Sequence, residues 1–319
     1  MVNLNVKFVA LALISILCCG MIGCGGDQSP KKVRVGYLPM VSSLTYFVAV
    51  ENGYFIDEEI QINAVPISKS DGLANELVAG NIDAGIELAI GPLLNRLQGD
   101  AASFRVFSTS SITIDNGFDG ILVSKESSIL SLEDLSGKKV GVFPGSTAKA
   151  TFSHVFVKHN PQLPLPVFVE LIPSVHLSSL DKGEVDALHA YEPALTTGIV
   201  THGFRKLYGS IYASQLSPSP IGVAAVNREW QSKNPEAAKG LIRALDRAVT
   251  FIRNEPDGAR QILAKYTGVN PEVASRINIM PMSTSNELDR ENLQQYLDIL
   301  RSMNEIDRRI DAASICIPK

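Results

Sequence analysis

Cysteine is scarce in this chain, and basic residues form no cluster. Four of the 319 residues are cysteine, and three of them, Cys18, Cys19 and Cys24, lie near the N-terminus. Cys316 therefore has no evident partner for a structural disulfide, so stability must come from a hydrophobic core. Lysine and arginine total 29 against 33 acidic residues. Without a basic patch, nucleic acid is not an expected partner.

Signatures of metal sites and of common catalytic centres are also missing. The five histidines show no paired ligand spacing, and no cysteine pair accompanies them, so a metal site is not expected. The chain has no Walker loop, no G-x-G-x-x-G and no G-x-S-x-G, each of which carries a known chemistry. We therefore expect no cofactor, no metal and no catalytic residue.

Charge is absent from a long N-terminal run. Lys7 precedes an apolar stretch from Phe8 to Leu17, and the next charge is Asp27, which is typical of an export signal. The sequence MIGC ending at Cys24 fits the bacterial lipobox, so residues 1–24 are predicted to be a lipoprotein signal peptide with the lipid on Cys24. An uncleaved membrane anchor is the alternative, because the uncharged run is nearly long enough to span a bilayer.

Either reading places the bulk of the protein on the outer side of a bacterial membrane. Residues 25–32 form a polar linker. Beyond it, apolar strand-like runs alternate with helix-like segments, a pattern typical of α/β proteins with parallel sheets.

Two segments recur at nearly the same offset. Residues 35–39 (VGYLP) match 140–144 (VGVFP), and residues 80–84 (GNIDA) match 183–187 (GEVDA). The offsets are 105 and 103 residues, which predicts two lobes that share one α/β plan.

Turn-rich segments suggest where the chain passes between the lobes. DNGFDG precedes a strand at residue 121, and SPSP at 217–220 precedes another. These two crossings would act as hinges for lobe closure. The prediction is lobe one at 33–118 plus 225–319, and lobe two at 119–224.

A ligand cleft is expected where the carboxyl ends of the equivalent strands face each other. Lobe one would contribute the loop of Pro39, Met40, Ser42 and Ser43. Lobe two would contribute Gly145, Ser146 and Thr147.

The start of the lobe-two helix suits an anionic or strongly accepting group, because free N–H groups, the helix dipole and hydroxyls meet there. Plain helix capping by Ser146 is the alternative.

Four further side chains lie within or just after strands that end at this cleft. They are Glu87, His189, Tyr191 and Glu192. Glu87 and Glu192 would favour a ligand amine or another hydrogen-bond donor. Alternatively, Glu192 favours its own helix N-terminus, and His189 is a satisfied core residue.

Several segments together resemble a known family. They are residues 35–39, AVENGYF at 49–55, 80–84, LEDLSGKKVG at 132–141, and YEP at 191–193. The chain resembles, over nearly all of residues 33–319, the substrate-binding lipoproteins of bacterial ABC importers. The group concerned covers nitrate, aliphatic sulfonate, taurine and thiamine-precursor binders.

The resemblance implies a two-lobed periplasmic-binding-protein fold of type II, with two hinge crossings and the ligand between the lobes. It implies delivery to an ABC permease driven by a separate ATPase. It also places the loops at Pro39–Ser43, Gly145–Thr147 and Tyr191–Glu192 near the ligand. The expected protein is a monomer, lipid-anchored through Cys24, that captures a small polar or anionic solute of the sulfonate, nitrate or taurine type.

Three alternatives remain open. The chain could bind a thiamine-pyrimidine precursor, or it could sense a solute for a receptor. It could also be an enzyme on the same scaffold, with His189 and Glu192 the nearest acid–base candidates. A family enzyme that builds the thiamine pyrimidine from its own histidine and pyridoxal phosphate carries a cysteine-rich motif, which this chain lacks.

Overall fold

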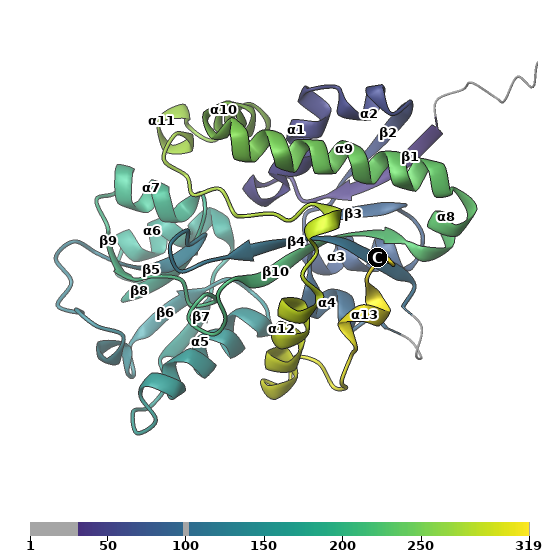
Figure 1. Cartoon of the computed structure of the whole chain (residues 1–319). Helices are drawn as coiled ribbons and strands as arrows, with labels where there is room; N and C mark the ends of the chain where they lie inside the picture. Colours follow the sequence, from purple (N-terminus) through teal and green to yellow (C-terminus); the bar gives the residue numbers. More distant parts are fainter. Residues whose placement is uncertain (1–30, 98–101, 319) are drawn as a thin grey trace, which may run out of the picture. The chain divides into compact units, whose positions relative to one another are not determined.

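The computed structural model describes residues 31–97 and 102–318 (Figure 1). The predicted signal peptide with Cys24, and the linker up to residue 30, lie outside the described residues. Two five-stranded sheets form the framework. We call each sheet, with the helices packed on it, a lobe. No helix within the described ranges is long and apolar enough to cross a membrane.

The strands divide between the sheets as follows. The first sheet has the order β2 (Ile60–Pro66), β1 (Lys31–Tyr37), β3 (Ala84–Ala89), β10 (Ser219–Asn227), β4 (Phe104–Ile112). The second sheet has the order β7 (Val167–Glu170), β6 (Lys139–Val142), β8 (Ala187–Tyr191), β5 (Asp119–Val123), β9 (Arg205–Tyr208).

The two orders correspond strand by strand. β1 pairs in parallel with β2 and β3, as β6 does with β7 and β8. An antiparallel strand follows in each sheet, β10 beside β3 and β5 beside β8. The register agrees as well, since Val35 pairs with Ala84 and Val140 with Ala187. The α/β class and the duplicated plan predicted from the repeats are confirmed.

A repeated aspartate explains one of the sequence matches. The Asp83 carboxylate accepts a hydrogen bond from the Arg34 backbone N–H at 2.8 Å. Asp186 accepts one from the Lys139 backbone N–H, also at 2.8 Å. The Asp83 carboxylate therefore ties the start of β3 to β1, and the Asp186 carboxylate ties the start of β8 to β6.

A repeated glycine explains another match. Gly36 lies in β1, where an added Cβ would come within 2.4 Å of the Ile82 side chain. At Gly141 in β6, an added Cβ would come within 2.8 Å of the Leu171 side chain. Glycine at both positions lets neighbouring apolar side chains pack directly on the strand backbone.

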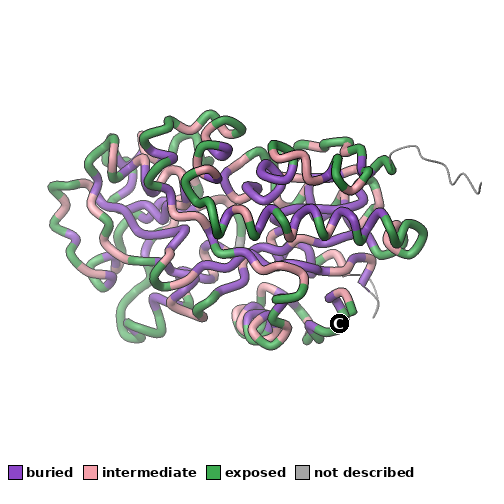
Figure 2. The backbone as a smooth tube through the Cα atoms, turned by 45° about the horizontal axis from the view of Figure 1, so that its top comes forward, coloured by how far each residue is buried: buried purple, intermediate pink, exposed green. Residues whose placement is uncertain are grey.

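Helices cover both faces of the first sheet. One face packs against α1 (Leu44–Glu51) and α9 (Pro235–Asn254), with Leu241 and Leu245 buried between them. The other face packs against α3 (Ser70–Val78) and α12 (Arg290–Ser302). Along the long helix α9, buried and exposed residues alternate, as expected of a helix with one face on the sheet (Figure 2).

The second sheet is covered in the same way. α5 (Ser146–His159) buries Phe152 and Phe156 on one face. α6 (His176–Asp181) and α7 (Ala194–Thr201) pack on the other. The remaining helices are α2 (Tyr54–Asp57), α4 (Ile90–Leu94), α8 (Arg228–Lys233), α10 (Pro256–Thr267), α11 (Pro271–Ala274) and α13 (Ala312–Ile315), with 3-10 turns η1 (Val41–Ser43), η2 (Glu133–Leu135), η3 (Pro173–Val175) and η4 (Ser285–Glu287).

The second crossing ends earlier than predicted. β10 begins at Ser219 and pairs along its length with β3 and β4 of the first sheet. Residues 219–224, predicted in lobe two, therefore belong to the first sheet, because the apolar run after Pro220 is already part of its ladder. The other lobe boundaries stay a prediction.

A segment of the first lobe lies against the first crossing. It connects α11 to η4 and covers residues 275–284, and we call it the connecting segment. The Asn278 side chain donates to the Gly117 carbonyl at 3.0 Å, and the Asn116 side chain donates to the Ile279 carbonyl at 2.6 Å. These bonds tie the connecting segment to the first crossing.

Candidate functional site

The loop after β1 supplies the first predicted ligand contacts. Pro39 is exposed, whereas Met40 and Ser42 are half-buried. Ser43 is fully buried, and its hydroxyl has no hydrogen-bond partner within the described part of the chain. The loop thus brings one unsatisfied polar atom to the end of the first sheet.

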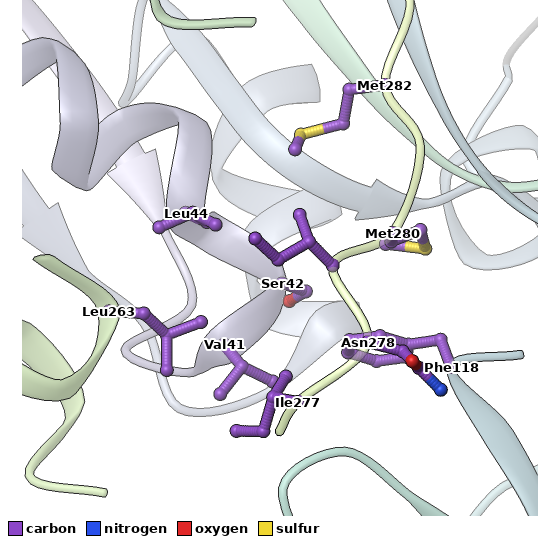
Figure 3. A pocket seen from close by; sticks show the side chains of 10 residues that line it. Val41, Ser42, Leu44, Phe118, Leu263, Ile277, Asn278, Met280 and Met282 are labelled. Atoms are coloured by element: carbon purple, nitrogen blue, oxygen red, sulfur yellow. The ribbon is translucent and has the colours of Figure 1, made fainter. Parts of the chain in front are cut away.

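A small pocket lies beside this loop (Figure 3). Val41 and Leu44, with Ile277 and Met280 of the connecting segment, form part of its lining. Its free volume is about 10 Å³, room for one water at most. Because the lining is mostly apolar, this pocket offers few hydrogen bonds to a polar solute.

The start of α5 contacts the first lobe. Gly145 occupies the N-cap position with a φ of 124°, and Ser146 is the first helical residue. Because the N-cap residue is glycine, it has no side chain that could cap the helix. The Thr147 hydroxyl donates to Glu305, 2.7 Å away, across the junction of the lobes. A Cβ added at Gly91 of α4 would lie 3.6 Å from the same hydroxyl. The predicted loop therefore does reach the opposite lobe.

Glu87 occupies a niche inside the first lobe. The Ser110 hydroxyl donates to its carboxyl group. On β10, a Cβ at Gly222 would lie only 2.5 Å from Glu87 Oε2, so the niche requires glycine there. Glu87 itself has a φ of 61°, unusual for a residue with a side chain. Burial raises the pKa of Glu87 to about 8, so the carboxyl group is mostly protonated at neutral pH.

His189 forms a buried pair with an aspartate at the start of β5. Its Nε2 lies 2.7 Å from Asp119 Oδ2, and both side chains are fully buried. Asp119 also accepts hydrogen bonds from the Ser210 hydroxyl and from the Ile211 N–H. His189 Nδ1 has no hydrogen-bond partner among the described residues. The alternative that His189 is a core residue with all its hydrogen bonds satisfied therefore holds for Nε2 but not for Nδ1.

Aromatic rings surround this histidine. The Tyr191 ring centroid lies 4.8 Å from that of His189, and the Tyr212 centroid lies 6.1 Å away. The two tyrosine hydroxyls are 3.3 Å apart. Burial raises the pKa of Tyr212 to about 12 and that of Tyr191 well above its usual value. Both hydroxyls therefore stay protonated and can donate or accept.

Glu192 binds to the first turn of the helix that follows it, which was the alternative to a role in ligand binding. Its carboxylate accepts from the Thr196 hydroxyl at 2.8 Å and from the Thr196 N–H at 3.1 Å in the first turn of α7. It also lies 3.4 Å from the N–H of Asn278. Burial raises its pKa. These bonds fix α7 and the connecting segment, so Glu192 has little free capacity for a ligand.

Buried polar atoms without hydrogen-bond partners occur in both lobes. In the described ranges, six buried side-chain polar atoms have no hydrogen-bond partner. Three of these atoms belong to Ser43 in the loop after β1, Thr151 in α5 and His189 in β8. Two more belong to Gln215, between β9 and β10, and Ser219, at the start of β10. Each unsatisfied buried group costs about 1–3 kcal/mol. A solute that supplied hydrogen-bond partners to such atoms would recover that cost.

Several of these residues escaped the sequence reasoning. Asp119 belongs to the turn-rich segment DNGFDG in the sequence, and Thr151 lies in α5 without any motif around it. Gln215 lies in a loop segment without a motif. Their roles depend on contacts between residues far apart in sequence, such as the 70 residues that separate His189 from Asp119.

The possible metal ligands of the described residues do not cluster. Within residues 31–97 and 102–318, no group of three or more histidine, cysteine, aspartate or glutamate side chains could hold a metal ion.

Comparison with known proteins gives the family. Residues 41–259 match the family described as NMT1/THI5 like, which covers more than half of the chain. The chain belongs to the NMT1/THI5-like family. This agrees with the resemblance inferred from the sequence.

Relatives of this NMT1/THI5-like chain include binding proteins and an enzyme. A putative aliphatic sulfonates-binding protein of Bacillus subtilis is 25% identical over 320 residues, covering 96% of this chain and 92% of the relative. The 4-amino-5-hydroxymethyl-2-methylpyrimidine phosphate synthase of Candida albicans is 22% identical over 277 residues, covering 83% of this chain and 78% of the enzyme.

A solved structure shows the fold. The periplasmic aliphatic sulphonate binding protein SsuA of Escherichia coli aligns with a TM-score of 0.72 at 19% identity, covering 90% of this chain and 98% of SsuA. The predicted two-lobed periplasmic-binding fold is confirmed by this similarity.

Proposed function

We propose that this protein is the extracytoplasmic solute-binding component of an ABC-type import system. The observation that carries the proposal is the pair of equivalent lobes, each with buried polar side-chain atoms that have no hydrogen-bond partner among the described residues. A solute bound between the lobes would gain partners from both lobes at once. The names of the sulfonate-binding relatives support the same role.

Closure follows from differential affinity. The solute binds the closed form more tightly because only closure brings groups of both lobes within hydrogen-bond distance, and this difference shifts the equilibrium. A micromolar dissociation constant corresponds to about −8 kcal/mol. A handful of hydrogen bonds at about 1 kcal/mol each, together with buried apolar surface, supplies much of this, and no covalent step is needed.

The partners belong to the same proposal. The solute is small and polar, of the sulfonate, nitrate or taurine type suggested by the family, and the protein passes it to an ABC permease. It acts as a monomer on the outer side of a bacterial membrane. Lipid on Cys24 would keep it beside the permease.

Solute capture can be tested by calorimetry and small-angle X-ray scattering on the same samples. A bound solute should raise the melting temperature by mass action and reduce the radius of gyration as the lobes close. Binding without any change in the radius would contradict closure. The Ser43→Ala, Ser219→Ala double variant tests the polar contacts: it should fold normally but bind the solute more weakly.

Membrane attachment has a separate test. Cys24→Ser should move the protein from membrane fractions to soluble fractions, because the residue that carries the lipid is gone. Continued membrane retention of this variant would favour an uncleaved anchor.

A second candidate function is an enzyme on the same fold. The Asp119–His189 pair leaves one ring nitrogen unpartnered within the described chain, an arrangement that could serve as a general base. The Candida albicans relative is named as a synthase. Turnover of a bound solute, abolished by His189→Gln, would support this candidate. Recovery of the solute unchanged after prolonged incubation would contradict it.

A further inference from the structure

The end of α12 reaches from the first lobe to the start of α5 in the second lobe. The chain turns after α12 so that the Glu305 carboxylate lies 2.7 Å from the Thr147 hydroxyl. The Gln215 side chain, between β9 and β10, lies 3.4 Å from Met303 Sδ. Residues 303–305, which we call the α12 turn, therefore contact the second lobe at two places.

The backbone of the α12 turn holds Glu305 in a fixed position. Asn304 has a φ of 59°, the left-handed conformation in which many helices end. The Glu305 N–H donates to the Leu300 carbonyl at 2.9 Å, and the Glu305 carbonyl accepts from the Asn95 side chain at 3.0 Å. Both backbone groups of Glu305 are thus bonded to the first lobe, and its carboxylate extends to the second.

The start of α5 favours a negative charge. Gly145 at the N-cap has no side chain, and the first turn of the helix contains no acidic residue. The positive end of the helix dipole therefore has no compensating charge within α5. Thr147 is the second residue of this 14-residue helix, and the carboxylate that its hydroxyl contacts comes from the opposite lobe.

The charge of Glu305 also acts on buried tyrosines of both lobes. Burial is the main cause that raises the pKa of Tyr212 to about 12 and the pKa of Tyr296 well above its usual value. The negative charge of Glu305 adds to both effects. Tyr296 lies in α12, and Tyr212 lies between β9 and β10. The half-buried Glu305 carboxylate therefore lies where the two lobes come together.

This helix start is also where the sequence predicts an anionic or strongly accepting group of the solute. A carboxylate has the chemistry of such a group, because it carries negative charge and its oxygens only accept. The Thr147 hydroxyl has a single proton, which it donates to Glu305. Since two neighbouring anions repel each other, an anionic solute takes this donor only by displacing Glu305.

We propose that Glu305 is a built-in substitute for an anionic solute. In the unliganded protein it occupies the solute's place at the start of α5 and holds the lobes together, and an anion that binds there displaces it. This rests on the proposed capture of a sulfonate-, nitrate- or taurine-type solute and adds a competitor from the chain itself. The apparent affinity for the solute is reduced by the fraction of molecules in which Glu305 occupies the site.

Glu305→Ala removes the substitute and leaves Thr147 in place. In small-angle X-ray scattering, the unliganded full-length variant should have a larger radius of gyration than the natural protein, because the bond between the lobes is lost. In calorimetry, it should bind ethanesulfonate about fivefold more tightly, since a competing hydrogen bond no longer has to be broken. The melting temperature of the unliganded variant shows whether it is folded.

Glu305→Gln is the second variant. Its amide can still accept from Thr147 but carries no charge, so its affinity for ethanesulfonate should lie between those of the natural protein and Glu305→Ala. The matched control is Glu291→Ala, which removes an exposed carboxylate at the start of α12. This control should scatter and bind ethanesulfonate as the natural protein does.

Several outcomes would overturn the inference. An ethanesulfonate affinity that Glu305→Ala leaves unchanged would do so, and so would an unchanged radius of gyration; solute capture by the natural protein would stand in either case. Weaker binding by Glu305→Ala would make Glu305 part of the solute site and not its substitute. If neither protein binds ethanesulfonate, nitrate or taurine, capture of this class of solute fails, and this inference fails with it.

Discussion

At the scale of single residues, Glu87 has the strongest consequence for stability. Its carboxyl group is buried beside Ser110 and faces a glycine on β10. Its pKa rises from 4.5 to about 8 in the folded chain. Between these values the folded chain holds a proton at Glu87 that the unfolded chain has released. The free energy of unfolding must therefore fall as the pH rises through this window.

Glu87→Gln should remove that pH dependence, because the amide stays neutral at every pH. The natural protein should lose stability between pH 5 and pH 8, by at most about 1.4 kcal/mol per pH unit from this group. Urea unfolding at pH 5, 6.5 and 8 measures the difference between the two proteins.

The matched control is Glu184→Gln, which changes an exposed carboxylate. It should leave the pH dependence of the natural protein in place. An identical fall with pH in Glu87→Gln and the natural protein would mean that Glu87 is already ionised in the folded chain.

The sequence indicates only some of the residues of the candidate site. Glu87 and His189 stand out because a carboxylate and an imidazole interrupt apolar strands. Nothing near Gln215 in the sequence indicates that its amide is fixed by Thr151, since that bond spans 64 residues. Partners brought together only by the fold leave no local pattern.

At the scale of elements, the repeated strand glycines are closely packed by neighbouring side chains. Gly141 in β6 has the Leu171 and Leu188 side chains within 2.8 and 3.1 Å of where a Cβ would stand. A methyl group there must displace packed side chains of the second lobe. Such overpacking costs about 1–3 kcal/mol.

Gly141→Ala should lower the free energy of unfolding by about this amount. Gly209→Ala should be close to neutral, because a Cβ at Gly209 would meet no atom within 4 Å. Chemical denaturation of the two variants measures the difference. Equal stability would show that the strand and its neighbours relax without cost.

Elements were more predictable than contacts. The apolar runs and the Gly80 and Gly183 helix ends indicate β1, β3, β6, β8 and the helices between them. The start of β10 was misjudged because prolines at 218 and 220 suggested a loop. Pairing with β4 decides where that strand begins, and this pairing cannot be seen in a local segment.

At the scale of the whole molecule, a direct bond joins the lobes away from the crossings. The Thr147 hydroxyl donates to Glu305 on the opposite lobe. We expect this bond to favour the arrangement of the lobes seen in the structure by roughly 1 kcal/mol, since it is partly exposed. Removing it should shift the population about fivefold toward open molecules.

Thr147→Val should therefore increase the radius of gyration of the unliganded protein in small-angle scattering and weaken solute binding. Thr267→Val is the control, because its hydroxyl bonds to the Leu263 carbonyl within α10. If both variants scatter as the natural protein does, the Thr147 bond does not hold the lobes together.

The pairing of Ser219 with Ile112 has a further consequence for how the chain is put together. The chain leaves the first sheet at Ile112 and returns at Ser219, on adjacent antiparallel strands about 5 Å apart. The intervening polypeptide, with the whole second sheet, is therefore topologically the loop of one β-hairpin. Ends so close together would let such an insert be gained or lost without altering the register of the strands that carry it.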